Sequence, residues 1–244
     1  MGYQAAYTNT TGAQLIAVGL GALYSNTTGI NNVAMGANAL YSNTTAARNT
    51  AVGYQAAYSN TTGNGVTSFG STTLFSNTTG NSNTAIGSWD ATTGIIGAMY
   101  YNTTGSYNVA VGTGALSSNT TASNNTAVGY QAGYSNTTAA NCVFIGSRAG
   151  YSSTAQGNTF IGEECGYSVT TGTGNTFIGS GQSGYYPAGY YITTGSSNTI
   201  LGNFNGNQGG LDIRTASNYI VLADGIGQPR LYSCLLYTSP SPRD

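Results

Sequence analysis

A repeat of seventeen residues runs along most of this chain and constrains its fold more than any other feature. Its clearest copy is NTAVGYQAAYSNTTG at Asn49–Gly63. Every copy carries a glycine at the same point, and these glycines are Gly2, Gly19, Gly36, Gly53, Gly70, Gly87, Gly112, Gly129, Gly146, Gly162, Gly179 and Gly202. A fixed period of this size is typical of one structural unit stacked many times. The sequence therefore predicts a rod of stacked units over residues 1–202.

The residues around this glycine predict one short strand in each copy. The residue before the glycine is always apolar, as is Val52, and the residue two positions earlier is β-branched, as is Thr50. Period two and β-branching are typical of strands. From their character we expect these two columns to point into the core and the residue between them, such as Ala51, to point outward.

A strand, a bend, a second short strand and a turn within seventeen residues form one coil of a parallel β-solenoid. The stretch SNTTG supplies the turn, because Asn and Gly readily adopt left-handed backbone. Stacked coils lie ~4.8 Å apart, so the eleven coils of the repeat region span roughly 50 Å. The predicted fold class is all-β, a parallel β-solenoid (β-roll), with a column of tyrosines stacked along its length.

The column expected to point outward suggests self-association. Its residues are small from Ala17 to Ala127, and the later ones are Phe144, Phe160, Phe177 and Ile200. Strands that are apolar on both faces are usually covered on both faces. We therefore expect this wall to pack against copies of itself as a homotrimer, with the phenylalanines filling the axis. The alternative is a monomeric solenoid with a weakly apolar face.

The composition argues against several classes of function. Charged residues make up 5 % of the chain, against ~25 % in an average protein. The net charge is −1, which gives no reason to expect nucleic acid or an anionic membrane as a partner. No apolar run approaches the ~18 residues of a membrane span. Without His or Lys, and with scattered acids, no catalytic pair or metal cluster can be assembled, so we predict no enzyme, no cofactor and no metal.

Several motifs resemble known fibrous proteins. NTAVG followed by a polar loop resembles the NSVAIG-type repeat of trimeric autotransporter adhesin heads, and the longer GYQAGYSNTT at Gly129–Thr138 is similar to repeats of phage-type tail-fibre proteins. The segment Leu211–Tyr232 resembles the strand-rich stretch that precedes the intramolecular chaperone of tail-fibre and endosialidase-like proteins. The resemblance implies a trimeric extracellular fibre that projects a receptor-binding surface, without catalysis in its repeats.

The end of the chain departs from the repeat. We expect a solenoid over 1–202, a strand-rich transition segment over 203–233 and a foreign tail over 234–244. The tail reads CLLYTSPSPRD and matches the translation of a sequencing-library transposase adapter. Such a segment is excluded from fold reasoning. The alternative is a genuine tail that contains proline.

Two intervals of the repeat are too long and supply candidate binding residues. Gly87 and Gly112 are 25 residues apart, and Gly179 and Gly202 are 23 apart. The extra residues include Ile95–Tyr101 and Gly184–Tyr191. Insertions in solenoids often form binding loops, and tyrosines combine a flat apolar ring with a hydroxyl. The residues predicted to contact host glycans are Tyr100, Tyr101, Tyr185, Tyr186, Tyr190 and Tyr191. The alternative is that these rings extend the tyrosine column or pack at a trimer seam.

The NTT triplets match the acceptor pattern for N-glycosylation. The candidate asparagines are Asn9, Asn26, Asn43, Asn60, Asn77, Asn102, Asn119 and Asn136. The alternative is structural, because Asn and Thr form turns and their amides and hydroxyls can pair between coils.

Three functions remain open from the sequence. The first is a non-catalytic tail-fibre segment on a virion, whose partners are its own copies and a cell-surface glycan or protein receptor. The second is the head of a secreted adhesin on a bacterial surface. The third is an ice-binding solenoid, since regular threonine arrays can order water; the expected inward direction of the Thr50 column counts against it.

Overall fold

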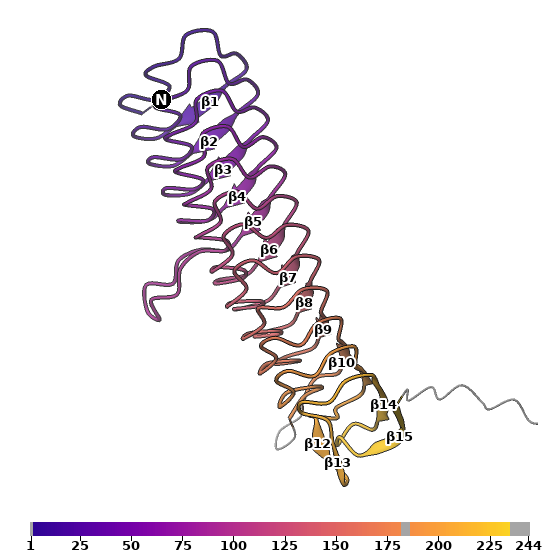
Figure 1. Cartoon of the computed structure of the whole chain (residues 1–244). Helices are drawn as coiled ribbons and strands as arrows, with labels where there is room; N and C mark the ends of the chain where they lie inside the picture. Colours follow the sequence, from indigo (N-terminus) through magenta and orange to yellow (C-terminus); the bar gives the residue numbers. More distant parts are fainter. Residues whose placement is uncertain (1, 182–185, 235–244) are drawn as a thin grey trace, which may run out of the picture.

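The computed structural model describes residues 2–181 and 186–234 and is an all-β parallel β-solenoid. Each coil contributes one short strand, and Figure 1 shows these strands stacked along one side of an elongated rod. The strands are β1 (Ile16–Val18), β2 (Val33–Met35), β3 (Thr50–Val52), β4 (Thr67–Phe69), β5 (Thr84–Ile86), β6 (Val109–Val111), β7 (Thr126–Val128), β8 (Val143–Ile145), β9 (Thr159–Ile161), β10 (Thr176–Ile178) and β11 (Thr199–Leu201). The predicted fold class is confirmed.

Neighbouring coils pair in parallel and in the register of the repeat. Thr50 stands opposite Thr67, and Val52 opposite Phe69. The same correspondence holds across both long intervals, where Thr84 pairs with Val109 and Thr176 pairs with Thr199. The register of the sheet is therefore unchanged across both long intervals.

The strands face the opposite way from the prediction. The middle residue of each strand points into the core, and Ala51 and Phe177 are both fully buried. The residues on either side point outward, so that Met35 is 44 % exposed and Phe69 is 55 % exposed. The prediction was wrong because most strands carry apolar residues on both faces, and a period of two does not say which face lies inside.

The phenylalanines of the middle column fill the interior of the coil and not a trimer axis. In the first coils the interior pairs a small middle residue with a large residue such as Leu40 or Leu74. In β8, β9 and β10 the middle residue is Phe, and the large residue is replaced by Gly150, Gly166 and Gly189. A Cβ built on Gly150 would lie 2.4 Å from Cδ1 of Phe144. The core therefore keeps its packing density, because the large side chain moves from the Leu position to the middle of the strand.

Two ladders of equivalent side chains join the coils. Asn43 Nδ2 donates to Asn26 Oδ1 at 2.8 Å, and Asn77 Nδ2 donates to Asn60 Oδ1 at 2.7 Å. The rings of the tyrosine column are stacked, as in the pair Tyr24–Tyr41, whose centroids are 4.9 Å apart. The predicted tyrosine column and the predicted pairing of asparagine amides between coils are both confirmed.

The rod ends in a different arrangement of strands. β14 (Tyr219–Ala223) adds one further parallel strand beside β11, and β15 (Pro229–Cys234) turns back antiparallel on β14. Between β11 and β14 in the chain, β12 (Asn207–Gln208) and β13 (Leu211–Asp212) form a small antiparallel hairpin. The sheet thus continues past residue 202. Residues 235–244, which make up most of the expected foreign tail, lie outside the described residues.

Candidate functional site

The first insertion leaves the rod earlier than predicted. It projects between β5 and β6 (Figure 1) and is closed by an antiparallel bridge between Asp90 and Ile95. Asp90 accepts hydrogen bonds from the hydroxyls of Thr92 and Thr93, both at 2.6 Å, and these bonds lower its pKa to about 2. By Ala98 the chain is again fully buried in the core. The segment that follows, with Tyr100 and Tyr101, therefore belongs to an ordinary coil.

Two of the predicted tyrosines belong to the stacked column. Tyr100 stacks on Phe75 at 5.0 Å between ring centroids, and Tyr190 stacks on Tyr167 at 5.2 Å. The alternative interpretation, that these rings extend the column, is confirmed for Tyr100 and Tyr190.

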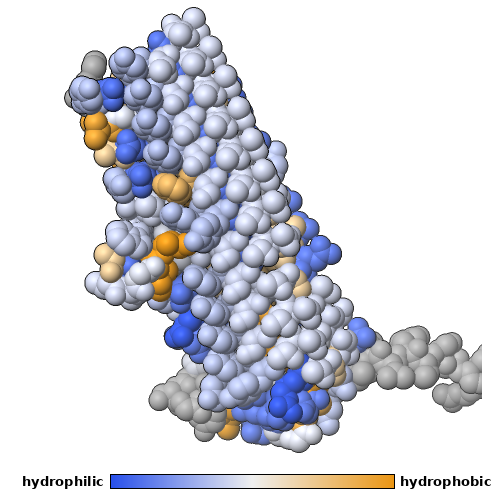
Figure 2. All heavy atoms as spheres, turned by 60° about the vertical axis from the view of Figure 1, so that its left-hand side comes forward, coloured by the Kyte–Doolittle hydropathy of each residue, from blue (hydrophilic) through white to orange (hydrophobic). Residues whose placement is uncertain are grey.

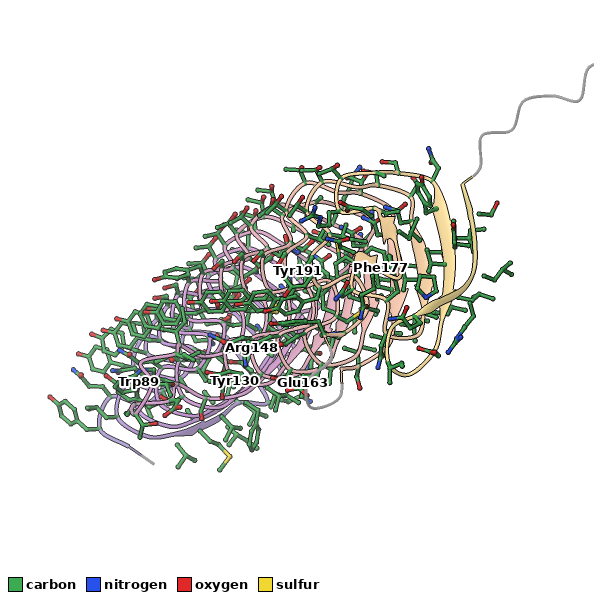
Figure 3. The ribbon with its side chains drawn as sticks, turned by 90° about the horizontal axis from the view of Figure 1, so that it is seen from below. Trp89, Tyr130, Arg148, Glu163, Phe177 and Tyr191 are labelled. Carbon is green, nitrogen blue, oxygen red and sulfur yellow. The ribbon has the colours of Figure 1, made fainter. Side chains whose placement is uncertain are left out.

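The residues that follow them behave differently. Tyr101 and Tyr191 occupy a position that is serine in most coils, such as Ser59. Tyr191 lies edge-on to Tyr190, with centroids 5.0 Å apart and an interplanar angle of 88°. Tyr101 packs in the same way against its own neighbour at 4.9 Å and 80°. In Figure 3, Tyr191 lies near the end of the row of stacked rings.

The structure brings three of the predicted residues into one cluster. Tyr186 from the second insertion lies 4.7 Å from Tyr190 and 4.9 Å from Tyr191, measured between ring centroids. A hydrogen bond with Tyr186, followed by desolvation, raises the pKa of Tyr191 to about 12. Tyr185 lies outside the described residues, and the Tyr100 pair sits in a separate coil.

A cleft of about 500 Å³ opens beside this cluster. It lies where the last repeat coil meets the segment that carries the β12–β13 hairpin. The residues that line it are Ser168, Tyr191, Thr193, Asp212, Arg214 and Thr215. Four hydroxyl-bearing side chains, one of them an aromatic ring, thus surround a single acid and a single base.

The acid and the base form a fixed pair. Arg214 Nε donates to Asp212 Oδ1 at 3.0 Å and Arg214 Nη2 donates to Oδ2 at 2.8 Å, which is a bidentate arrangement. The backbone N–H of Arg214 also donates to Oδ1 at 3.1 Å. These bonds lower the pKa of Asp212, so the carboxylate is ionised at neutral pH. The backbone N–H of Thr193 donates to the Arg214 carbonyl at 2.8 Å and holds the segment against the last coil.

Sequence reasoning missed Asp212 and Arg214. Their only signal was an acid and a base two residues apart in a chain that is otherwise almost uncharged. Nothing in the repeat could place them opposite Tyr191, because the β12–β13 hairpin interrupts the period.

The outer face of the sheet is a second candidate surface. It carries two columns of side chains in register, one on each side of the buried middle residue. The column next to the glycines is apolar throughout: Val18, Met35, Val52, Phe69, Ile86, Val111, Val128, Ile145, Ile161, Ile178, Leu201 and Leu222. The other column is Ile16, Val33, Thr50, Thr67, Thr84, Val109, Thr126, Val143, Thr159, Thr176, Thr199 and Ile220. By contrast, Figure 2 shows a flank of the rod covered by regular rows of intermediate hydropathy.

The asparagines of the NTT triplets are enclosed by the fold. Asn26, Asn43, Asn60, Asn77, Asn102, Asn119 and Asn136 are all fully buried, and their side-chain amides are hydrogen-bonded inside the coils. Asn9, in the first coil, is half-buried and accepts a bond from Asn26. The folded rod has no room for a glycan at the seven buried positions.

Comparisons with family models, with curated proteins and with solved structures give no match. Over residues 2–181 and 186–234, no three His, Cys, Asp or Glu side chains are grouped so that they could hold a metal ion. The same residues include no helix of the length and apolar character needed to cross a membrane. The two surfaces described above are therefore the features of the molecule that bear on its function.

Proposed function

We propose that this chain is a non-catalytic segment of a tail-fibre-like protein, which assembles with copies of itself as a homotrimer and attaches a virion to a host cell surface. The observation that carries the proposal is the apolar column on the outer face of the sheet. It runs along the whole rod without a charged residue. Large exposed apolar patches of this kind mark interaction surfaces.

Burial of the large apolar side chains in that column would stabilise an assembly of several copies. Leu201, Ile178, Met35 and Phe69 are 40–55 % exposed, although each belongs to a regular strand. Apolar surface removed from water contributes roughly 25 cal/mol per Å². A column that repeats in every coil collects this contribution over the full length of the rod.

The geometry of the column favours a symmetric partner. Every coil presents the same two strand positions in the same register, so a second copy related by an axis parallel to the rod meets an equivalent strip at each level. Three copies rather than two follow from the resemblance to tail-fibre and adhesin repeats. This face replaces the middle column, Ala51 to Phe177, as the proposed interface.

The proposed attachment to a cell is supported by the resemblance and by the tyrosine cluster, which lies outside the strands of the sheet. With the sheet face covered by other copies, the tyrosine cluster and its cleft remain at the outside of the fibre. An extracellular location on a virion and a glycan or protein receptor are part of the same proposal.

Cell binding tests the attachment directly. Fluorescently labelled full chain is incubated with a panel of diverse bacterial isolates, and bound label is measured by flow cytometry. We expect saturable binding to a subset of isolates that excess unlabelled chain displaces. Absence of displaceable binding to every isolate would overturn the attachment role.

The head of a secreted bacterial adhesin is the alternative with the same architecture. The genes beside this one separate the two. A downstream chaperone domain among virion genes supports the tail fibre, whereas a membrane-anchor barrel or a sorting signal supports the adhesin.

Ice binding is a second candidate that one observation favours. The threonines of the Thr50 column point outward, so the expectation that counted against this function was wrong. Thr50 and Thr67 stand opposite one another on adjacent strands, and so do Thr159 and Thr176. The neighbouring apolar column weakens the case, because Phe69 and Met35 project from the face. Thermal hysteresis in a nanolitre osmometer is the test, and we expect none.

A further inference from the structure

We propose that the cleft beside Tyr191 binds a neutral pyranose ring of a cell-surface glycan. The inference rests on the proposed attachment function and assigns its ligand class and contact residues. It depends on one juxtaposition: an edge-on tyrosine, a bidentate Asp212–Arg214 pair and three aliphatic hydroxyls surround one cleft of about 500 Å³. That volume falls within the ~300–1,000 Å³ of small-molecule sites.

Tyr191 supplies the apolar contact. Its ring lines the cleft and is fixed from two sides, by Tyr190 at 5.0 Å and by Tyr186 at 4.9 Å. A ring held in this way loses little conformational entropy on binding. The C–H face of a pyranose can pack against a tyrosine ring. The phenol remains protonated at neutral pH and is hydrogen-bonded to Tyr186, so its oxygen can accept a hydrogen bond from a sugar hydroxyl.

Asp212 and Arg214 supply directed polar contacts. An ionised carboxylate has about four acceptor sites, and three hydrogen bonds from Arg214 occupy only part of this capacity. A pair of adjacent sugar hydroxyls can donate to the remaining sites. The guanidinium has five N–H groups, so donors remain for sugar oxygens after the bidentate pair is made.

The charge balance of the cleft selects a neutral ligand. One carboxylate and one guanidinium cancel, and the other four lining residues are Ser168, Tyr191, Thr193 and Thr215, which are uncharged. A carboxylated or phosphorylated sugar would have to approach Asp212 without a second cation among the lining residues. Hydroxyl groups act as both donors and acceptors and match both members of the pair.

The chain provides its own matched variants. Tyr191→Ser installs the residue that most coils carry at this position, and so the fold should tolerate it. Tyr101→Ser makes the same change in the other edge-on pair, where the ring centroids of Tyr100 and Tyr101 are 4.9 Å apart. Tyr101 is not among the residues that line the cleft with Asp212 and Arg214. Asp212→Asn keeps the shape of the side chain but removes the charge and two acceptor sites.

The experiment uses the full chain with the methyl pyranosides of glucose, galactose, mannose and N-acetylglucosamine as probes, and with N-acetylneuraminic acid as a charged comparison. Saturation-transfer NMR detects binding, and a titration gives the dissociation constant. We expect at least one neutral glycoside to bind, and Tyr191→Ser and Asp212→Asn each to weaken it about tenfold or more, while Tyr101→Ser leaves it unchanged. Circular dichroism verifies that each variant keeps the wild-type β signal.

Three outcomes would overturn the inference. These are no binding of any neutral glycoside, binding only of the charged sugar, and binding that is equally strong in the Tyr191→Ser variant. Cell binding by the same variants separates this inference from the proposed function. If Tyr191→Ser binds cells as well as the wild type, the receptor site lies elsewhere and attachment stands. If the wild-type chain binds a glycoside but no cells, attachment fails while the cleft assignment stands.

Discussion

Gly150 leaves the space that the ring of Phe144 occupies. A Cβ on Gly150 would lie 2.4 Å from Cδ1 and 2.5 Å from Cε1 of that ring, and the backbone at Gly150 has a φ of +60°. The same relationship joins Gly166 to Phe160 and Gly189 to Phe177. These glycines therefore allow the interior of the later coils to accept a large ring on the strand.

We predict that Gly150→Ala destabilises the rod by about 2–4 kcal/mol, since it combines overpacking of the core with a left-handed backbone. The matched control is Gly157→Ala. Gly157 has a similar φ of +73°, but a Cβ there would meet nothing closer than 3.8 Å. Urea denaturation followed by circular dichroism measures both. Equal losses of stability in the two variants would show that Phe144 does not need the space.

The buried asparagine ladder should contribute strongly to stability. Asn77 donates to Asn60 Oδ1 and accepts from Asn102 Nδ2, both at 2.7 Å. Asn77→Ala would leave the Asn102 amide without this acceptor inside the coil, so we expect a loss of about 2–4 kcal/mol. Asn64→Ala is the control, because Asn64 is exposed. Thermal melts of both variants test the expectation, and a similar small shift in both would contradict it.

The loop between β5 and β6 should loosen in acid. Its Asp90 has a pKa of about 2, lowered mainly by hydrogen bonds from Thr92 and Thr93. A carboxyl whose folded pKa is depressed favours the folded loop above its ordinary pKa of ~3.9, and this contribution is lost as the pH falls toward 2. An NMR titration of the Asp90 carboxyl measures the pKa directly. In Thr92→Val the pKa should rise, and an unchanged value would refute the assigned cause.

Cys165 should resist thiol reagents in the folded rod. The thiol is fully buried, and desolvation raises its pKa to about 12. The thiolate is the reactive form, so both access and ionisation oppose reaction at pH 8. Labelling with a maleimide followed by mass spectrometry of the Cys165 peptide measures it. Rapid modification without urea would contradict the burial, whereas modification only after unfolding is expected.

The first strand of each repeat coil was predicted at the right residues but with the wrong face inward. The second short strand expected in each coil was wrong, because each described coil contributes one strand and is otherwise turn and bend. The columns at Thr50 and Val52 mark the two ends of β3, as predicted, and the same holds for the other coils. Which face lies inside depends on volumes across the coil, such as the exchange between Leu40 and Gly150, and no single column reveals these. The apolar column that contains Val52 belongs to the outer face of the sheet, where Met35 and Phe69 are exposed in the single chain.

Only the tyrosines of the candidate site could be predicted from the sequence. The long intervals indicated where tyrosines leave the pattern, and Tyr186, Tyr190 and Tyr191 do meet. The placement of Asp212 depends on a hairpin beyond the last regular coil, where the period no longer predicts neighbours. Tyr100 and Tyr190 were misleading because their rings simply continue the stacked column.

The central claim is that the outer face of the sheet packs against further copies of the chain. Sedimentation equilibrium of the full chain measures this most directly. The wild type is compared with the double variant Met35→Ser/Phe69→Ser and with the control Tyr54→Ser. The control removes a ring that is 53 % exposed and lies outside the strand. We predict three times the chain mass of 24.8 kDa for the wild type and the control, with dissociation of the double variant. A wild-type chain that stays monomeric up to the highest concentration measured would contradict the account.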